Sequence, residues 1–159
     1  MDLQYLIDRQ QIVDTINKLA TFADLHQWDA LSADVFASEL TVDYTSLFGG
    51  EPQTLKAVDL VSSWKKLLPG FESTQHLLGN HLVTINGAKA TAMAAFRAHH
   101  FLPNKSGQDS WVVGGYYNYE LQKQGSSWRI CKLTLNFQYT EGNQELPALA
   151  QERAKAAKR

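Results

Sequence analysis

The chain has 159 residues, of which 44% are apolar and 19% charged, and its formal net charge is −1. This length suffices for one sizeable hydrophobic core, so we expect a single domain over residues 1–159, with its core at about 7–140 and a C-terminal tail at 141–159. The 15 basic and 16 acidic residues leave no basic excess for a nucleic-acid partner. No apolar stretch approaches the roughly 20 residues that span a bilayer, so no membrane partner is expected.

The cysteine content and the start of the chain bear on the compartment. The single cysteine, Cys131, can form no internal disulfide and has no second thiol to share a metal with it. The opening MDLQYLIDRQ lacks a basic segment followed by an apolar one. A reducing, cytoplasmic location is therefore the expectation.

The first half of the sequence reads as helices around one strand. Apolar residues recur at three- and four-residue spacing from Asp2 to Ala23, which predicts an amphipathic helix with Leu6, Ile12, Val13, Ile16, Leu19, Ala20 and Ala23 on its apolar side. A short helix follows over 29–34, and the alternation at 40–45 predicts a half-buried strand. Thr54 is the expected N-cap of a further helix, which Pro69-Gly70 ends.

From residue 72 onward the pattern changes to four long strands, at about 72–86, 88–101, 110–124 and 127–140. Each exceeds the usual strand length, so a strongly curved sheet is expected. Asn86-Gly87 predicts a type I′ hairpin, and Gly79, Gly114 and Gly115 predict bulges or bends inside strands. Helices followed by a meander indicate an α+β fold, in which a cone-shaped, curved antiparallel sheet packs on the N-terminal helices and encloses a pocket.

The period of two along 88–101 separates the adjacent histidines of FRAHH. His100 shares a face with the small residues Ala90, Ala92, Ala94 and Ala98 and with Phe96, whereas His99 points to the opposite face. The adjacent pair therefore cannot hold a metal together, and no metal is expected. The small residues either leave room for a ligand cavity or allow the first helix to pack closely, and the pattern does not separate these two interpretations.

Three further residues are candidates for chemistry. Asp24 ends the first helix, where the helix dipole disfavours a carboxylate, so it either has a histidine partner or lies in solvent. His76 is a polar residue in a strand flanked by leucines. Tyr44 shares the core side of its strand with Val42, where a tyrosine can form a cavity wall or simply belong to the core.

Taken together, the stretches FADLHQWDALSADVFASELTVDY, STQHLLGN, FRAHH and GGYYNYELQKQGSSWRICKL resemble the SnoaL-like part of the nuclear-transport-factor-two-like superfamily. Within it they are similar to the scytalone dehydratase and lindane dehydrochlorinase families. The similarity runs in order from about Ile7 to Tyr139. The resemblance implies a cystatin-like, SnoaL-like fold, which is the cone-shaped curved sheet with an enclosed pocket described above.

The resemblance also implies roles for individual residues. Asp24 matches the aspartate that pairs with a catalytic histidine in both families. His76 matches the base of the dehydrochlorinases and a water-orienting residue of the dehydratases, and His100 matches the general base of the dehydratases. Tyr44 matches a tyrosine that polarises the substrate carbonyl through water. The expected substrate-binding residues are Trp64, Phe96, Trp111, Tyr117 and Asn136.

These roles lead to a functional hypothesis with alternatives. We expect a cofactor-independent lyase of the dehydratase type, in which an Asp-His dyad removes a proton next to the carbonyl of a small cyclic or aromatic hydroxy-ketone. Ala23 stands where the dehydratases have a tyrosine, which points to a substrate other than scytalone. An isomerase or cyclase would share the first step, and a non-catalytic binding or oligomer-forming protein of this fold is the third alternative.

The resemblance further implies assembly. Related proteins are commonly dimers or trimers, so a homo-oligomer is expected. The outer face of the long strands, with Tyr117, Tyr119 and Leu121, is the expected interface.

Overall fold

The computed structural model describes residues 2–157, so residue 1 and residues 158–159 of the expected domain and tail lie outside the described part. Its helices are α1 (Leu3–Asp24), α2 (Trp28–Ala30), α3 (Thr45–Phe48), α4 (Ala57–Leu67) and α5 (Leu146–Ala156), with a π-helical turn at Leu31–Val35 and a 3-10 turn at Leu68–Gly70. The strands are β1 (Phe36–Asp43), β2 (Gln53–Lys56), β3 (Ser73–Asn86), β4 (Lys89–Phe101), β5 (Ser110–Gln124) and β6 (Ser127–Gly142). The four long strands lie within two residues of the expected bounds.

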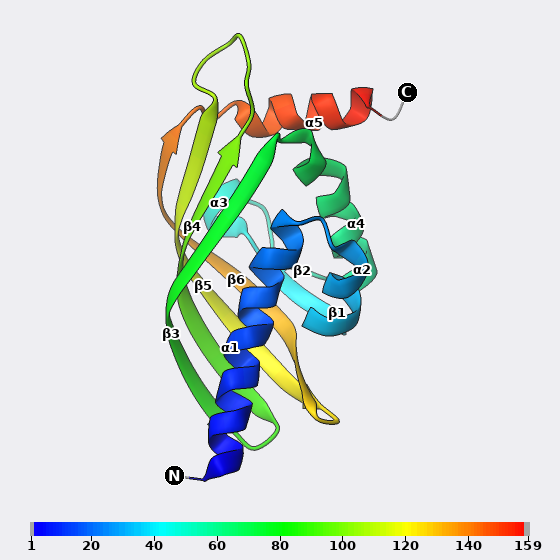
Figure 1. Ribbon diagram of the computed structural model, residues 1–159, viewed down its shortest axis with the longest axis vertical. Helices are drawn as coiled ribbons and strands as arrows, with labels where there is room; N and C mark the ends of the chain where they lie inside the picture. Colours follow the sequence, from blue (N-terminus) through cyan, green and yellow to red (C-terminus); the bar gives the residue numbers. More distant parts are fainter. Residues whose placement is uncertain (1, 158–159) are drawn as a thin grey trace.

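The strands form one six-stranded sheet in the order β2-β1-β6-β5-β4-β3. Strands β3 to β6 make the predicted antiparallel meander, but β1 runs parallel to β6, so the sheet is mixed rather than wholly antiparallel. Figure 1 shows α1, α2 and α4 on one side of the curved sheet and α5 across one end of it. The α+β architecture expected from the order of elements is confirmed.

Two local predictions need correction. Residues 53–56 form the edge strand β2, in which Thr54 pairs with Thr41 of β1, so the helix begins at Ala57 and Thr54 is not its N-cap. The backbone groups of residues 53–56 are hydrogen-bonded to β1 and are therefore not available to a helix. In the first hairpin Asn86 pairs with Lys89, so the two-residue loop starts at Gly87, which has φ +59°. Glycine at the first loop position with positive φ is typical of type II′ rather than type I′.

Irregularities in the long strands account for the curvature of the sheet. The pairing register shifts between Gly79 and Leu82 in β3. It shifts again where Gly114 and Gly115 of β5 pair with Tyr139 and Phe137, so the extra residue there is Gln138 of β6. Bulges of this kind bend a strand and increase its twist. A side chain at Gly115 would also meet the backbone oxygen of Asn136, so this position requires glycine for close approach of the strands.

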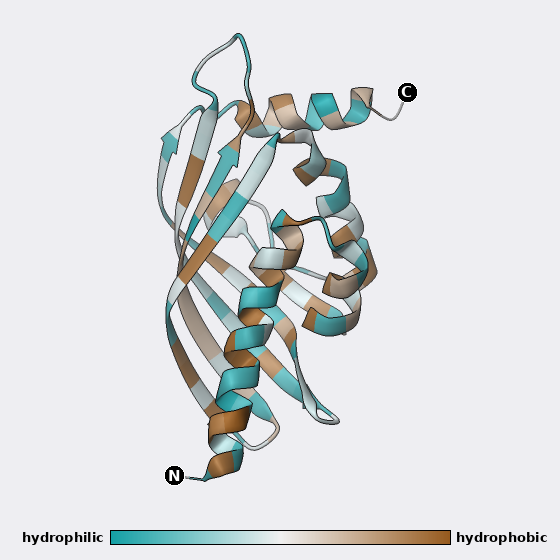
Figure 2. Cartoon of the chain, in the orientation of Figure 1, coloured by the Kyte–Doolittle hydropathy of each residue, from teal (hydrophilic) through white to brown (hydrophobic). Residues whose placement is uncertain are grey.

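The core lies between α1 and the concave face of the sheet. Ile12, Ile16 and Ala23 of α1 are buried there, whereas Leu6, near the start of the helix, is 47% exposed and does not belong to the apolar side as expected. The alternation of hydrophobic and hydrophilic bands along α1 is visible in Figure 2. None of the helices within residues 2–157 is long and apolar enough to cross a membrane.

The two faces of β5 are the reverse of the expectation. Tyr117, Tyr119 and Leu121 are all buried on the concave side, packed in the core, while Tyr116 and Glu120 lie on the convex side and are exposed. The predicted oligomer interface through the first three residues is therefore wrong. Alternation separates two faces of a strand, but it does not say which one is inside.

Helix α5 closes the end of the sheet near the 3-10 turn. It packs so closely that a side chain at Gly70 would meet the backbone oxygen of Ala150. Arg153 adds a hydrogen bond of 3.4 Å to the Gly70 oxygen and an exposed ion pair of 3.0 Å to Glu72. The C-terminal tail expected at 141–159 thus contains a helix that is docked on the domain through its buried residues Leu146 and Ala150.

Candidate active site

A cavity of about 190 Å³ opens on the concave side of the sheet. Its wall combines the end of α1, the short helix α3, the end of α4 and the inward side chains of β3 to β6. The lining residues are Leu19, Ala20, Ala23, Tyr44, Leu47, Phe48, Trp64, Leu67, Leu68, Phe71, His76, Phe96, Ala98, His100, Trp111, Val113, Tyr117, Leu135 and Pro147. Among these described residues there is no Asp, Glu, Lys or Arg, so two imidazoles and two phenols are the principal polar groups of the wall.

The cavity interpretation of the small residues on β4 holds for one end of the strand. Ala98 lines the cavity beside Phe96 and His100. Ala92 and Ala94 belong to the close-packed core that includes Ile12 and Ile16. The cavity therefore opens only at the end of β4 that carries His100.

Asp24 and His76 form a hydrogen-bonded pair at the edge of this cavity. Asp24 Oδ1 lies 2.7 Å from His76 Nδ1, and Asp24 Oδ2 accepts a bond of 2.7 Å from the backbone N–H of His76. Thr74 Oγ1 donates to Asp24 Oδ1 at 2.8 Å. These three bonds offset the unfavourable position of a carboxylate at the end of α1. Of the two alternatives for Asp24, a histidine partner or a position in solvent, the structure shows the first.

The electrostatics of the pair follow from its bonds. Burial alone would raise the pKa of the Asp24 carboxyl, but the hydrogen bonds and charge of His76, together with the bond from Thr74, outweigh it and lower the pKa. Because a carboxylate can only accept, His76 carries its proton on Nδ1, and Nε2 is the nitrogen that can take a second one. The side chains are 13% and 16% exposed, so the pair is largely shielded from water.

Thr74 was not among the predicted site residues. It precedes His76 by two positions in β3 and therefore projects from the same face of the strand. That spacing is the signal that could have identified it, once His76 was known to point inward.

His100 lies beside the pair but is bonded differently. It faces His76 edge-on with ring centroids 5.7 Å apart, and its Nδ1 lies 3.2 Å from the backbone oxygen of Trp111. The ring packs between Phe71 at 4.9 Å and Trp111 at 4.6 Å and is 6% exposed. Burial, with the nearby charge of His76, lowers the pKa of His100 to about 4, so it is neutral at physiological pH.

Two tyrosines bring hydroxyl groups to the cavity wall. Tyr44 follows β1 and precedes α3, and Tyr117 projects from β5 with its ring stacked on Phe96 at 4.2 Å. Burial raises the pKa of each phenol well above its ordinary value of 10.0, so both remain protonated donors. Within residues 2–157, no side chain or backbone group hydrogen-bonds to either hydroxyl.

The structure brings together most of the predicted site residues. Trp64, Phe96, Trp111 and Tyr117 all line the cavity. Asn136 does not: its Nδ2 lies 3.4 Å from the backbone oxygen of Tyr116, its register partner on the convex side of the sheet. Asn136 follows Leu135, whose side chain lines the cavity, so strand alternation places the Asn136 side chain on the opposite face. The prediction that Asn136 lines the substrate cavity is therefore wrong.

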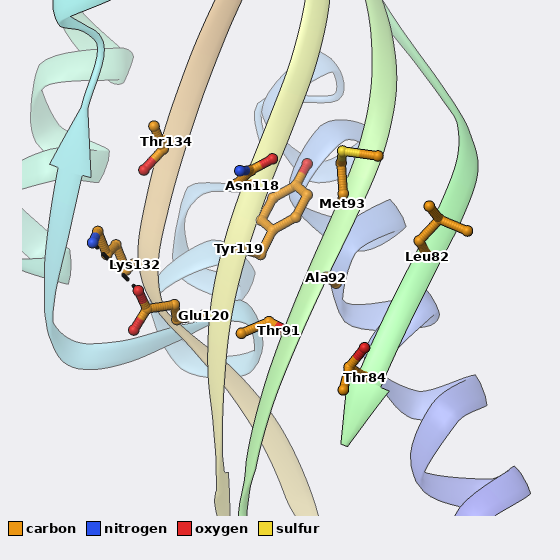
Figure 3. Close-up of a pocket in the computed structure, with 10 residues that line it drawn as sticks. All are labelled: Leu82, Thr84, Thr91, Ala92, Met93, Asn118, Tyr119, Glu120, Lys132 and Thr134. Carbon is orange, nitrogen blue, oxygen red and sulfur yellow. Dashed lines mark ion pairs between the residues drawn. The ribbon is translucent and has the colours of Figure 1, made fainter. Parts of the chain in front are cut away.

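A second hollow, of about 370 Å³, lies on the convex side of the sheet (Figure 3). Its rim is formed by side chains such as Leu82, Met93 and Asn118, and the Lys132–Glu120 ion pair of 3.3 Å crosses one end. It contains no histidine, and the charged groups are exposed. No group of three or more His, Cys, Asp or Glu residues in the described part of the chain is arranged to hold a metal ion. The concave cavity is therefore the candidate active site.

Comparison with known proteins adds the family. The SnoaL-like domain family matches residues 4–134. No curated protein matches the chain in sequence.

Solved structures share the fold along nearly the whole chain. The Kfla4162 protein from Kribbella flavida is 31% identical, with a TM-score of 0.86 over 91% of this chain and 99% of that one. A candidate scytalone dehydratase from Novosphingobium aromaticivorans is 16% identical, with a TM-score of 0.76 over 88% and 90% of the two chains. The hexachlorocyclohexane dehydrochlorinase LinA-type3 from Novosphingobium barchaimii is 18% identical, with a TM-score of 0.72 over 91% and 95%. At 16% and 18% identity, the similarity to the last two structures shows a shared fold and nothing more. The fold and the long family match agree with the resemblance read from the sequence, and the chain belongs to the SnoaL-like domain family.

Proposed function

We propose that the protein is a cofactor-independent lyase of the dehydratase type, which acts on a small, uncharged cyclic or aromatic hydroxy-ketone. The observation that carries the proposal is the 2.7 Å pair of Asp24 and His76 at the wall of an apolar cavity. A carboxylate that accepts the Nδ1 proton orients the imidazole and stabilises its cationic form, which is what a general base requires. The solved structures named for scytalone dehydratase and dehydrochlorinase activity provide support by analogy of fold.

The geometry favours His76 over His100 as the base. His76 has the carboxylate partner, whereas His100 is bonded to a neutral backbone oxygen and has a pKa of about 4. A base with so low a pKa takes up a proton poorly at neutral pH. His76 therefore has the proton-abstracting role in this proposal, and Asp24 positions it.

The reaction uses groups that are present in the wall. His76 Nε2 removes a proton from the carbon next to the substrate carbonyl, and the electron pair moves to form an enolate. Tyr44 donates a hydrogen bond, directly or through water, to the developing oxyanion. The enolate then expels the β-hydroxyl, which takes the proton from His76 and leaves as water while the carbon–carbon double bond forms. The chain's own groups account for every proton, so no cofactor enters the scheme.

Proton abstraction can be tested before the substrate is known. A panel of cyclic β-hydroxy-ketones is incubated with the enzyme in D₂O, and exchange at the carbon next to the carbonyl is followed by NMR while enone formation is followed by ultraviolet absorbance. We expect Asp24→Asn and His76→Asn each to reduce both rates by about 10²- to 10⁴-fold, the usual contribution of general acid–base catalysis.

Matched controls separate this loss from a general effect. Asp59→Asn and His26→Asn make the same chemical changes at exposed positions, and His26 already has φ of 57°, which asparagine accepts. Both should retain the wild-type rates. Exchange without loss of water would identify an isomerase or cyclase instead. The absence of both exchange and enone formation with every ketone, or rates that survive in His76→Asn, would contradict the proposal.

A further inference from the structure

His100 is the second histidine of the cavity, and proton abstraction by His76 does not use it. Because the backbone oxygen of Trp111 can only accept, the 3.2 Å contact assigns the proton of His100 to Nδ1. Nε2 then carries a lone pair and no hydrogen. His100 is thus a hydrogen-bond acceptor in the cavity wall to which the proposed reaction gives no role.

The surroundings hold this acceptor in place. Phe71 and Trp111 pack against the ring, and only 6% of the residue is exposed, so the imidazole has little freedom to turn. In the sheet His100 pairs with Thr74, two positions from His76, so both imidazoles project from the concave face of neighbouring strands. No described residue donates a hydrogen bond to His100 Nε2.

The polar groups of the cavity therefore divide between two parts of a ligand. The phenols of Tyr44 and Tyr117 are donors and suit a carbonyl oxygen. His76 takes the proton from carbon. A hydroxyl that departs as water must receive a proton, which a neutral acceptor cannot supply. His100 instead suits a hydroxyl that donates to it and remains on the product.

We infer that His100 Nε2 accepts a hydrogen bond from a second, retained hydroxyl of the substrate, and so makes the cavity selective for uncharged rings that carry a hydroxyl donor at this position. The inference rests on the proposed function for its substrate, since it assumes that the cavity binds the reacting molecule. When a ligand leaves a buried acceptor without a donor, the binding free energy loses more than the hydrogen bond itself, because the acceptor has been removed from water without compensation. A ligand that lacks the hydroxyl should be discriminated against.

Phenol and toluene provide a direct test, because they differ by a hydroxyl in place of a methyl and both are small enough for a cavity of about 190 Å³. Their dissociation constants are measured by calorimetry at pH 7.5 for the wild type, His100→Leu, His100→Gln and His76→Asn. The quantity compared is the ratio of the toluene constant to the phenol constant. Because both ligands share a ring, the ratio cancels general changes in the shape of the cavity.

We expect this ratio to fall by about two- to tenfold in His100→Leu, the range that corresponds to one net hydrogen bond. It should recover in part in His100→Gln, whose amide oxygen reaches about as far as Nε2. It should remain near the wild-type value in His76→Asn. On the wild type alone, the ¹⁵N resonance of His100 Nε2 should shift on addition of phenol and not of toluene, which provides a test even if a variant fails to fold.

Several results would overturn the inference. These are an equal ratio in wild type and His100→Leu, loss of the preference in His76→Asn alone, an unmoved Nε2 resonance, or no saturable binding of either ligand. The outcome is separable from that of the proposed function. Proton exchange or enone formation with no preference for phenol would refute only the role of His100. A preference for phenol with neither exchange nor enone formation would refute only the lyase.

Discussion

The buried, neutral state of His100 should make the protein less stable in mild acid. Its pKa is about 4 in the folded protein against 6.5 for an unperturbed histidine. Well above pH 6.5 the imidazole is neutral in both states and pH has no effect through it. As the pH falls from 6.5 towards 4, the unfolded chain binds a proton that the folded protein does not, so stability decreases.

The size of the effect follows from the two pKa values. Between pH 7.5 and 5.0 the free energy of unfolding should fall by about 2 kcal/mol through His100, and by about 3 kcal/mol once the pH is below both values. Urea denaturation followed by tryptophan fluorescence measures this loss in the wild type and in His100→Leu. The leucine variant lacks the titrating group, so its stability should fall by about 2 kcal/mol less over the same interval.

A control and a refuting result complete this prediction. His26→Asn removes an exposed histidine, and it should lose as much unfolding free energy between pH 7.5 and 5.0 as the wild type. The contribution of the half-buried His81, whose pKa burial also lowers, is common to all three proteins and cancels in the comparison. If the wild type and His100→Leu lose stability in parallel, His100 is not held neutral by burial and the reasoning fails.

Three further changes test other parts of the structure. Gly70→Ala should destabilise the protein by about 1–3 kcal/mol in urea denaturation, because the new methyl meets the backbone oxygen of Ala150; an unchanged midpoint would contradict this contact. Asp8→Ala should lower the thermal midpoint, because Trp128 Nε1 loses its buried acceptor at 3.1 Å, and Asp8→Asn should restore part of it. Thr74→Val should slow ketone exchange about fivefold, through loss of one hydrogen bond to the paired aspartate, with phenol affinity unchanged; equal loss in both would indicate a change of cavity shape.

Local patterns along the chain predict the long strands well. Alternation over 88–101 places His100 on the same face as Phe96, and the structure has both in the cavity wall. The strand glycines mark two of the three positions at which the register shifts among β3 to β6, and the shift between Glu120 and Leu121 has no glycine beside it. These features depend on a few neighbouring residues, which is why they can be recognised without the fold.

Features that depend on distant pairing are harder to predict. Nothing in spacing indicates which histidine meets Asp24, since His76 lies 52 residues away and the contact depends on how α1 crosses β3. The inside of β5 was assigned to the wrong face because tyrosines occur on both, at Tyr116 and at Tyr117. Asn136, by contrast, could have been placed from local alternation, because it follows Leu135, which lines the cavity.

The absence of charged residues from the described wall of the cavity also determines which molecules can compete for it. A phosphate or carboxylate that entered would lose its hydration, and no lysine or arginine lines the cavity to replace it. Sugar phosphates, nucleotides and organic acids would therefore be excluded even at high concentration. The site would remain open to scarce, uncharged ring compounds without needing high affinity for them.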